Sequence, residues 1–108
     1  MTVSTHVLDG MLGTPAAGVS VLLDRRDADG TWSRVAAGRT DASGRLHAGG
    51  AAPGVHRLTF GTGAYFAARG VAAFYPEVAI TFEVTGADQH YHVPLLLSPF
   101  AYSTYRGS

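Results

Sequence analysis

Short apolar runs alternate with polar, turn-forming residues along the whole chain. The runs are rich in Val, Leu, Phe, Tyr and Thr, and Gly, Pro, Asp and Ser separate them at intervals of roughly ten residues, which is typical of a β-sandwich or a β-barrel. The pattern predicts eight strands, over residues 2–9, 18–26, 31–39, 45–47, 55–61, 77–85, 89–97 and 100–106. The exception is GTGAYFAARGVAAFYPE, which allows about two helical turns that end at Gly70. We therefore expect an all-β fold with one short helix.

Two predicted turns carry the residues that tight turns require. DADG precedes the strand at 31–39, and DASG precedes the strand at 45–47. In each, Asp accepts backbone hydrogen bonds and Gly supplies a positive φ. These turns fix where the two strands begin.

Alternation along two strands sorts their side chains into an inner and an outer face. In the strand 89–97 the apolar inner set is Tyr91, Val93, Leu95 and Leu97, and the outer set is His90, His92, Pro94 and Leu96. In the strand 2–9 the inner set is Val3, Thr5 and Val7, and the outer set is Ser4, His6 and Leu8. His6 and His92 are therefore both predicted to point away from the core.

Length and composition limit the organisation of the chain and its partners. A chain of 108 residues fits one domain, residues 1–108. An apolar content of 46% with 15% charged residues suggests surface buried against another copy. The formal net charge is zero and the basic residues are scattered, so we expect neither nucleic acid nor an anionic membrane as a partner.

Two further absences in the sequence restrict the chemistry and the location. The chain has no cysteine, which excludes disulfides, thiolate zinc ligands and a cysteine nucleophile within it. MTVSTHVLDG does not read as a secretory leader, and no window has the length of a membrane span. We expect a cytoplasmic protein.

Four motifs, in order and spanning nearly the whole chain, carry a family resemblance. They are STHVLDGMLGTPAAGVSVLL, TDASGRL, FYPEVAITFEV and HYHVPLLLSPFAYSTYRGS. The chain resembles the 5-hydroxyisourate hydrolases, the transthyretin-related enzymes of purine catabolism. Transthyretin has a similar opening and a YST ending, but it lacks the His, Arg and YRGS set. The resemblance implies a transthyretin-like sandwich of two sheets, antiparallel or mixed, assembled as a homotetramer (a dimer of dimers) with active sites at the dimer–dimer interface.

The resemblance also implies the reaction and its residues. The reaction is hydrolysis of 5-hydroxyisourate, a small molecule, to 2-oxo-4-hydroxy-4-carboxy-5-ureidoimidazoline during urate degradation, without a cofactor. The family's catalytic set falls on His6, Arg45, His92 and Ser108. Its substrate-binding set falls on Arg45, Tyr105, Arg106 and Ser108.

The chemistry of these side chains suits the hydrolysis of a ring lactam. Imidazole has a pKa near the working pH, so we expect His92 to deprotonate water and His6 to hold that water or protonate the leaving nitrogen; the two roles can be exchanged. Arg45 offers a planar fork of donors to the carbonyl and ring-nitrogen acceptors. Tyr105 would wall the channel, and Ser108 would act through its hydroxyl or a terminal carboxylate.

Each of these residues also has a simpler interpretation. Outside its motif, a histidine on an outer strand face is most often solvated, and an arginine after a turn is most often exposed. Arg106 serves equally well as an interface ion-pair partner. His90 and His92 have the spacing of a zinc pair, and His6 could supply a third ligand, so a metal can bind there, but the reaction does not require one and we assign no metal ligands. Ser108 lacks the context of a covalent nucleophile.

Two other functions compete with the hydrolase. A non-catalytic ligand carrier of the transthyretin type would use the same channel without turnover, but the bulk of Tyr105 and the polar His6 and His92 argue against it. A structural sandwich module is the other candidate, because fold alone does not define function. Such a module would be a monomer. The oligomeric state separates the module from the hydrolase.

Overall fold

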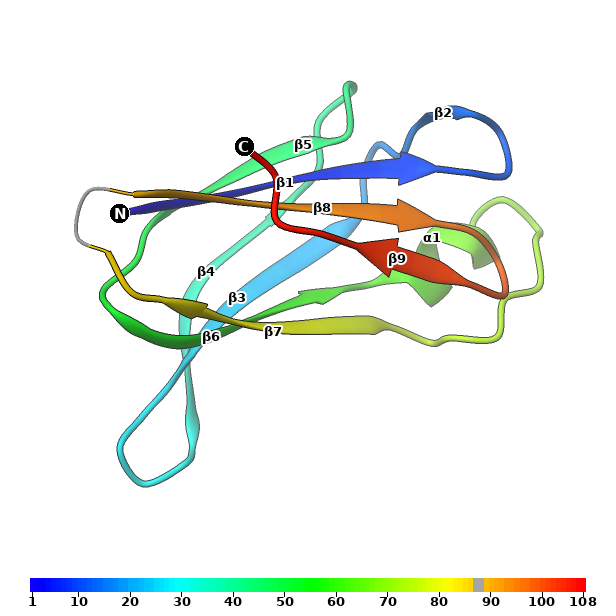
Figure 1. The fold of residues 1–108 in the computed structure, drawn as a ribbon. Helices are drawn as coiled ribbons and strands as arrows, with labels where there is room; N and C mark the ends of the chain where they lie inside the picture. Colours follow the sequence, from blue (N-terminus) through cyan, green and yellow to red (C-terminus); the bar gives the residue numbers. More distant parts are fainter. Residues whose placement is uncertain (87–88) are drawn as a thin grey trace.

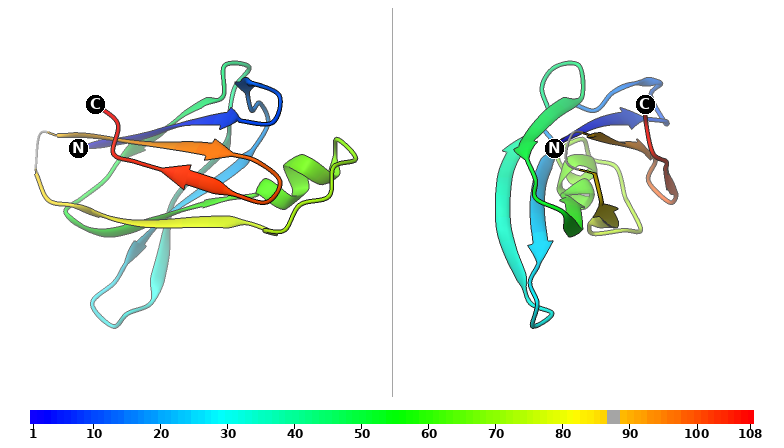
Figure 2. Two further views of the ribbon diagram at one scale, coloured as in Figure 1. Left: turned by 45° about the vertical axis from the view of Figure 1, so that its right-hand side comes forward. Right: turned by 60° about the vertical axis from the view of Figure 1, so that its left-hand side comes forward.

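The computed structural model describes residues 1–86 and 89–108 and consists of two stacked β-sheets with one short helix at one end (Figures 1 and 2). The strands within these residues are β1 (Thr2–Asp9), β2 (Thr14–Pro15), β3 (Ser20–Arg26), β4 (Trp32–Arg39), β5 (Arg45–Gly50), β6 (Gly54–Phe60), β7 (Val78–Val84), β8 (His90–Leu97) and β9 (Tyr102–Thr104). The helix α1 covers Thr62–Ala67. The predicted all-β sandwich is confirmed.

The two sheets differ in how their strands pair. The first sheet has the order β2-β1-β8-β9, and β5 pairs with the same edge of β1 as β2 does. Within it β1 and β8 run parallel, whereas the other pairs are antiparallel, so this sheet is mixed. The second sheet, β4-β3-β6-β7, is antiparallel throughout. The parallel pair matters most for the site, because it places a strand from the start of the chain beside a strand near its end.

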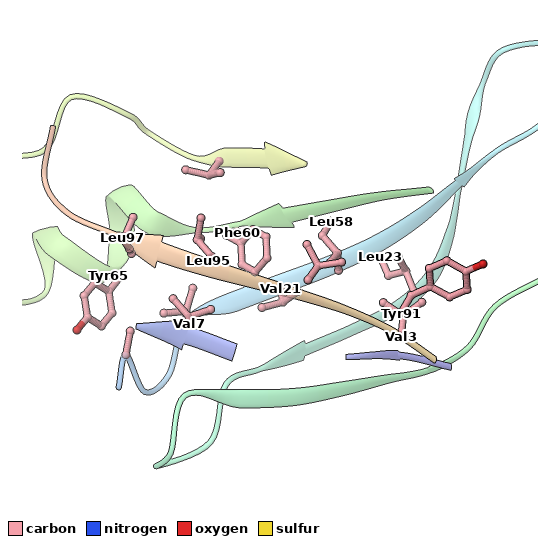
Figure 3. Packing of buried hydrophobic residues seen from close by; sticks show 14 of the residues in the cluster. Val3, Val7, Val21, Leu23, Leu58, Phe60, Tyr65, Tyr91, Leu95 and Leu97 are labelled. Atoms are coloured by element: carbon pink, nitrogen blue, oxygen red, sulfur yellow. The ribbon is translucent and has the colours of Figure 1, made fainter. Parts of the chain in front are cut away.

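The core lies between the sheets and contains the inner faces predicted by alternation (Figure 3). Val3 and Val7 of β1 and Leu95 of β8 are fully buried against Leu58 and Phe60 of β6. At about 25 cal/mol per Å² of apolar surface, each such side chain contributes roughly 1.5–3 kcal/mol by leaving water. This packing fixes the register of β1 and β8, because a slip by one residue would turn their apolar side chains to the solvent.

Three details of the predicted strands need correction. There are nine strands within the described residues rather than eight, because the two-residue β2 was missed; Pro15 disfavours a strand interior, but β2 lies at a sheet edge. The strand predicted at 45–47 extends through Gly50 as it pairs with β1. The strand predicted at 100–106 is regular only over Tyr102–Thr104.

No helix within the described residues is long and apolar enough to cross a membrane.

A buried polar contact attaches the helix to the first sheet. The Tyr65 hydroxyl donates to Asp9 Oδ2 at 2.8 Å, and both residues are buried. Burial and the neighbouring Asp9 carboxylate raise the pKa of Tyr65 to about 12. The Asp9 side chain also accepts from the backbone amides of Met11 and Leu12, so it holds the turn after β1 as well.

Candidate active site

The outer face of the first sheet brings together three residues that are far apart in the sequence. On adjacent strands, His6 of β1 pairs with Arg45 of β5, and Ser4 of β1 pairs with His92 of β8. Paired residues of neighbouring strands project on the same side of a sheet. Arg45, His6 and His92 therefore share one face, as alternation predicts for the two histidines.

The DASG turn positions Arg45 and His6 together. Asp41 Oδ1 accepts hydrogen bonds from the amides of Ser43 and Arg45, at 2.9 and 3.0 Å. These bonds lower the pKa of Asp41, the one from Arg45 most, so its carboxylate persists in acid. The Ser43 carbonyl in turn accepts from His6 Nε2 at 2.9 Å. This contact commits the Nε2 proton of His6 to the backbone and leaves Nδ1 as the free nitrogen of the neutral ring.

Gly44 of the same turn occupies a position that only glycine fits. Its φ is +78°, and a Cβ built there would lie 2.4 Å from the Val7 carbonyl oxygen. The Gly44 carbonyl also accepts from the Val7 amide at 2.7 Å. The turn is thereby pressed against β1 beside His6.

The surroundings of His92 favour its neutral form. Its Nδ1 lies 2.8 Å from the Ser4 hydroxyl oxygen, and Ser4 is buried. Partial burial lowers the pKa of His92 below its usual 6.5, and the positive charges that His90, His6, Arg45 and His47 carry or can acquire lower it further. At neutral pH, His92 therefore has a neutral ring, with one nitrogen free to accept a proton.

The C-terminal tail returns to the same strand after β9. Leu95 pairs with Thr104, and this register continues to an isolated bridge between His92 and Gly107. The Gly107 amide donates to the His92 carbonyl at 2.8 Å. A Cβ at Gly107 would lie 2.5 Å from Cδ2 of the His92 ring, so glycine permits this close approach. Figure 1 shows the tail turning back across β8 after β9.

The remaining tail residues take two different positions. The Arg106 guanidinium lies 4.7 Å from the Tyr91 ring centroid and donates to Gln89 Oε1 at 3.2 Å. Tyr91 belongs to the inner face of β8, so within one protomer Arg106 lies on the other side of the strand from His6. Tyr105 and Ser108 are exposed.

A cavity of about 260 Å³ opens beside His92 at the edge between the sheets. Its walls are mostly apolar side chains, from Ile80, Phe82, Tyr91 and Val93, together with Glu83, His92, Thr104, Tyr105 and Arg106. Neither His6 nor Arg45 lines this cavity. Of the predicted catalytic residues, only His92 lines this cavity, together with Tyr105 and Arg106 of the predicted substrate-binding set.

No metal centre is evident in the part of the chain that the structure describes. Within residues 1–86 and 89–108, His, Asp and Glu do not assemble into a group of three or more that could hold a metal ion.

Three contributors to this site were not identified from the sequence. They are the Ser4 hydroxyl, the Ser43 carbonyl and the backbone of Gly107. Alternation places Ser4 on the outer face, but its contact with His92 depends on the parallel pairing of β1 with β8. No local signal in the sequence reports that pairing.

Comparison with known proteins adds independent information about this arrangement. A 5-hydroxyisourate hydrolase of Caulobacter vibrioides is 50% identical over 113 residues, covering 97% of this chain and 96% of that protein. The structure of the Klebsiella pneumoniae 5-hydroxyisourate hydrolase is 40% identical, covers 100% of both chains and superposes with a TM-score of 0.87. Sea bream transthyretin, solved in complex with thyroxine, is 34% identical, covers 97% of this chain and 93% of its own, and has a TM-score of 0.92.

The backbone resembles both kinds of protein, so the fold alone does not separate a hydrolase from a carrier. A family model described as the HIUase/Transthyretin family matches residues 3–107. Because the match spans nearly all of the sequence, the chain belongs to the HIUase/Transthyretin family.

Proposed function

We propose that this chain hydrolyses 5-hydroxyisourate to 2-oxo-4-hydroxy-4-carboxy-5-ureidoimidazoline, a step of urate degradation. The observation that carries the proposal is the convergence of His6, Arg45 and His92 on one outer face, in register on three neighbouring strands. The relatives named as 5-hydroxyisourate hydrolases support it. A carrier needs no such set of proton-accepting and charged side chains.

The first step is attack by water on a ring carbonyl. His92 Nε2 accepts a proton from water, and the resulting hydroxide adds to the carbonyl carbon to give a tetrahedral oxyanion. The lowered pKa of His92 supports this role, because the ring is neutral at pH 7. His6 Nδ1 is placed to hold the water, since its Nε2 already bonds to Ser43.

The second step opens the ring. The Arg45 guanidinium stabilises the oxyanion with a charge that does not titrate. The carbon–nitrogen bond then breaks, the ring nitrogen takes the proton from a histidine, and the new carboxyl group loses its proton to water. One water molecule is consumed, and no oxidant or cofactor takes part.

The tail and a partner subunit would complete the site. We propose a cytoplasmic homotetramer, a dimer of dimers, in which the outer face of the first sheet meets that of another copy. Two observations support this assembly: Arg45 and His90 are exposed on the histidine face, and the tail, which pairs with His92 at Gly107, leaves Tyr105 and Ser108 exposed. A second copy would enclose the face and exclude bulk water.

The test is the decay of 5-hydroxyisourate generated in the cuvette by urate oxidase. We expect the absorbance to fall well above the spontaneous rate, and sedimentation analysis to give the mass of a tetramer. A decay equal to that of buffer, together with tight binding of an aromatic ligand such as thyroxine, would contradict the proposal and favour the carrier. Localisation is tested separately by cell fractionation.

A further inference from the structure

Four side chains on β1 and β8 form a continuous hydrogen-bonded chain that ends at His92. Ser4 Oγ lies 2.8 Å from His92 Nδ1 and 2.8 Å from His90 Nε2. His90 Nδ1 in turn contacts the Thr2 hydroxyl. We call this set, Thr2, His90, Ser4 and His92, the hydroxyl–imidazole chain.

The parallel register of β1 and β8 produces this arrangement. Thr2 pairs with His90 and Ser4 pairs with His92, so hydroxyls and imidazoles alternate on the two strands of one face. The two imidazole rings stack, with centroids 6.3 Å apart and planes at 17°. Ser4 contacts a nitrogen of each ring and is only 5% exposed, whereas His90 is exposed. The Ser4 hydroxyl therefore has little access to water as an alternative hydrogen-bond partner.

A serine hydroxyl has a single proton, and this makes the chain directional. Between two imidazole nitrogens, Ser4 donates to one and accepts from the other. Where it donates to His90, His92 must carry its proton on Nδ1, and His92 Nε2 is left with a free lone pair. Where it donates to His92, Nε2 carries the proton and cannot act as a base.

We propose that Ser4 is a positioning residue that couples His90 to His92 and holds His92 with Nε2 unprotonated. In this state His92 Nδ1–H donates to Ser4, Ser4 O–H donates to His90 Nε2, and His90 Nδ1–H donates to Thr2. Ser4 then both accepts and donates, both nitrogens of His90 have a partner, and His92 Nε2 is the one ring nitrogen of the chain left free. The inference rests on the proposed hydrolysis, because it assigns the free Nε2 to the attacking water.

The charges around His92 are compatible with this state. The groups that face it are His6 from β1, Arg45 and His47 from β5 and His90 from β8, and the tail contributes the backbone of Gly107. Burial lowers the pKa of His92 most, and these four side chains, which are positive or can become so, lower it further. The ring is therefore neutral near pH 7, which the directional chain requires.

Kinetics of Ser4 variants test the inference. We expect Ser4→Ala to lower kcat roughly 10- to 100-fold with little change in KM, the range typical when a partner that orients a histidine is lost. Ser4→Thr keeps the hydroxyl and should retain kcat within about threefold of wild type. Wild-type kcat in Ser4→Ala, or equal losses in both variants, would overturn the inference, because the effect would then not come from the hydroxyl.

A matched pair of histidine variants tests the second half of the chain. His47 is also exposed on this face, with its ring centroid 6.4 Å from that of His90, but it is outside the hydroxyl–imidazole chain. At pH 8, His90→Gln should lower kcat about tenfold, and His47→Gln should leave it unchanged. Equal effects of the two substitutions would contradict the coupling.

The tautomers of the free protein provide a test that needs no substrate. Two-bond and three-bond ¹H–¹⁵N correlations of protein with ¹⁵N-labelled imidazole rings, recorded at pH 8, report which ring nitrogen carries the proton. We expect the proton of the neutral ring on Nδ1 in both His90 and His92. Ser4→Ala should change the tautomer of both rings, and His47→Gln should change neither. A wild-type His92 proton on Nε2 would overturn the inference even if the enzyme is active. Absence of wild-type turnover would instead contradict the proposed hydrolysis, so the two failures are distinguishable.

Discussion

The outer faces of the two sheets are both polar, yet they use polar residues in opposite ways. On the second sheet, Asp24 is buried between Arg34 and Arg57, with nitrogen–oxygen distances of 2.7 and 3.8 Å. Arg57 also lies 4.2 Å above the ring of Trp32. On the first sheet, histidines and a single arginine share a face through hydroxyl and carbonyl contacts.

The difference separates groups that stabilise from groups that can react. The three ion pairs among residues 1–86 and 89–108 all involve the second sheet or the turn after β3. Paired charges of fixed sign satisfy one another over a wide pH range. A neutral imidazole, by contrast, can accept a proton and return it. The second face therefore serves stability, and the first face is suited to chemistry.

Among single substitutions that test the contrast between the two faces, we expect the largest loss of kcat at Arg45. Arg45→Lys keeps the positive charge but loses the planar fork that matches two acceptors. We expect kcat to fall by roughly 10²–10³-fold, the usual cost of removing an oxyanion donor, with an unchanged melting temperature. Steady-state kinetics and thermal unfolding measure the two quantities. As the matched control, Arg34→Lys on the second face should leave kcat unaltered.

A smaller loss is expected at Gly107. A methyl group there would meet Cδ2 of the His92 ring at 2.5 Å, and that ring is held by Ser4. Gly107→Ala should therefore lower kcat by about 10- to 100-fold through misorientation of His92, the range expected when a histidine loses its orientation. The control is Gly18→Ala, where a Cβ would have no neighbour within 4 Å and only the positive φ of 76° is strained. Equal kcat values in Gly107→Ala and wild type would show that the tail does not constrain His92.

The second face should respond in stability alone. Asp24→Asn removes the carboxylate that both arginines share, and we expect it to lower the free energy of unfolding by about 1–3 kcal/mol. The turnover of 5-hydroxyisourate should not change at a temperature where the variant is folded. Chemical denaturation and the absorbance assay, run on the same preparation, check both parts. A loss of turnover in folded Asp24→Asn would contradict the division of roles between the faces.

The pH dependence should show the smallest effect. Since the pKa of His92 is lowered, kcat should stay high as the pH falls to 6.5 and decline only below it. The same shift makes the free energy of unfolding decrease as the pH falls from 6.5 toward the folded-state pKa, because the unfolded chain binds the proton more readily. A kcat profile from pH 5 to 8 tests the first statement. A midpoint above 6.5, or a flat profile, would contradict it.

The sequence predicts the sheets better than it predicts the contacts between strands. Alternation assigns the faces of Val3, His6, His92 and Leu95 correctly, because every second residue of a half-buried strand points inward and must be apolar. The two-residue β2 carries too few residues for any period to register. The position of a strand can be predicted from the residues within it, whereas the strand with which it pairs depends on packing throughout the core.

The same limit applies to the candidate site. Motif resemblance selected His6, Arg45 and His92, and the structure places all three on one face. Ser4 was sorted to that face without a role, because its contact requires the parallel register of strands more than eighty residues apart. The roles of all these residues stay predictions, and those of Tyr105, Arg106 and Ser108 also depend on the proposed interface between subunits.

The most direct measurement compares the two faces in one assay. The decay of freshly generated 5-hydroxyisourate is recorded with wild type, His92→Ala, a chain that lacks Ser108 and Asp24→Asn, each checked by sedimentation for its oligomeric state. The account predicts rapid decay with wild type and Asp24→Asn, and decay near the spontaneous rate with the other two at unchanged mass. Wild-type decay in His92→Ala would contradict the claim that the histidine face is the catalytic one.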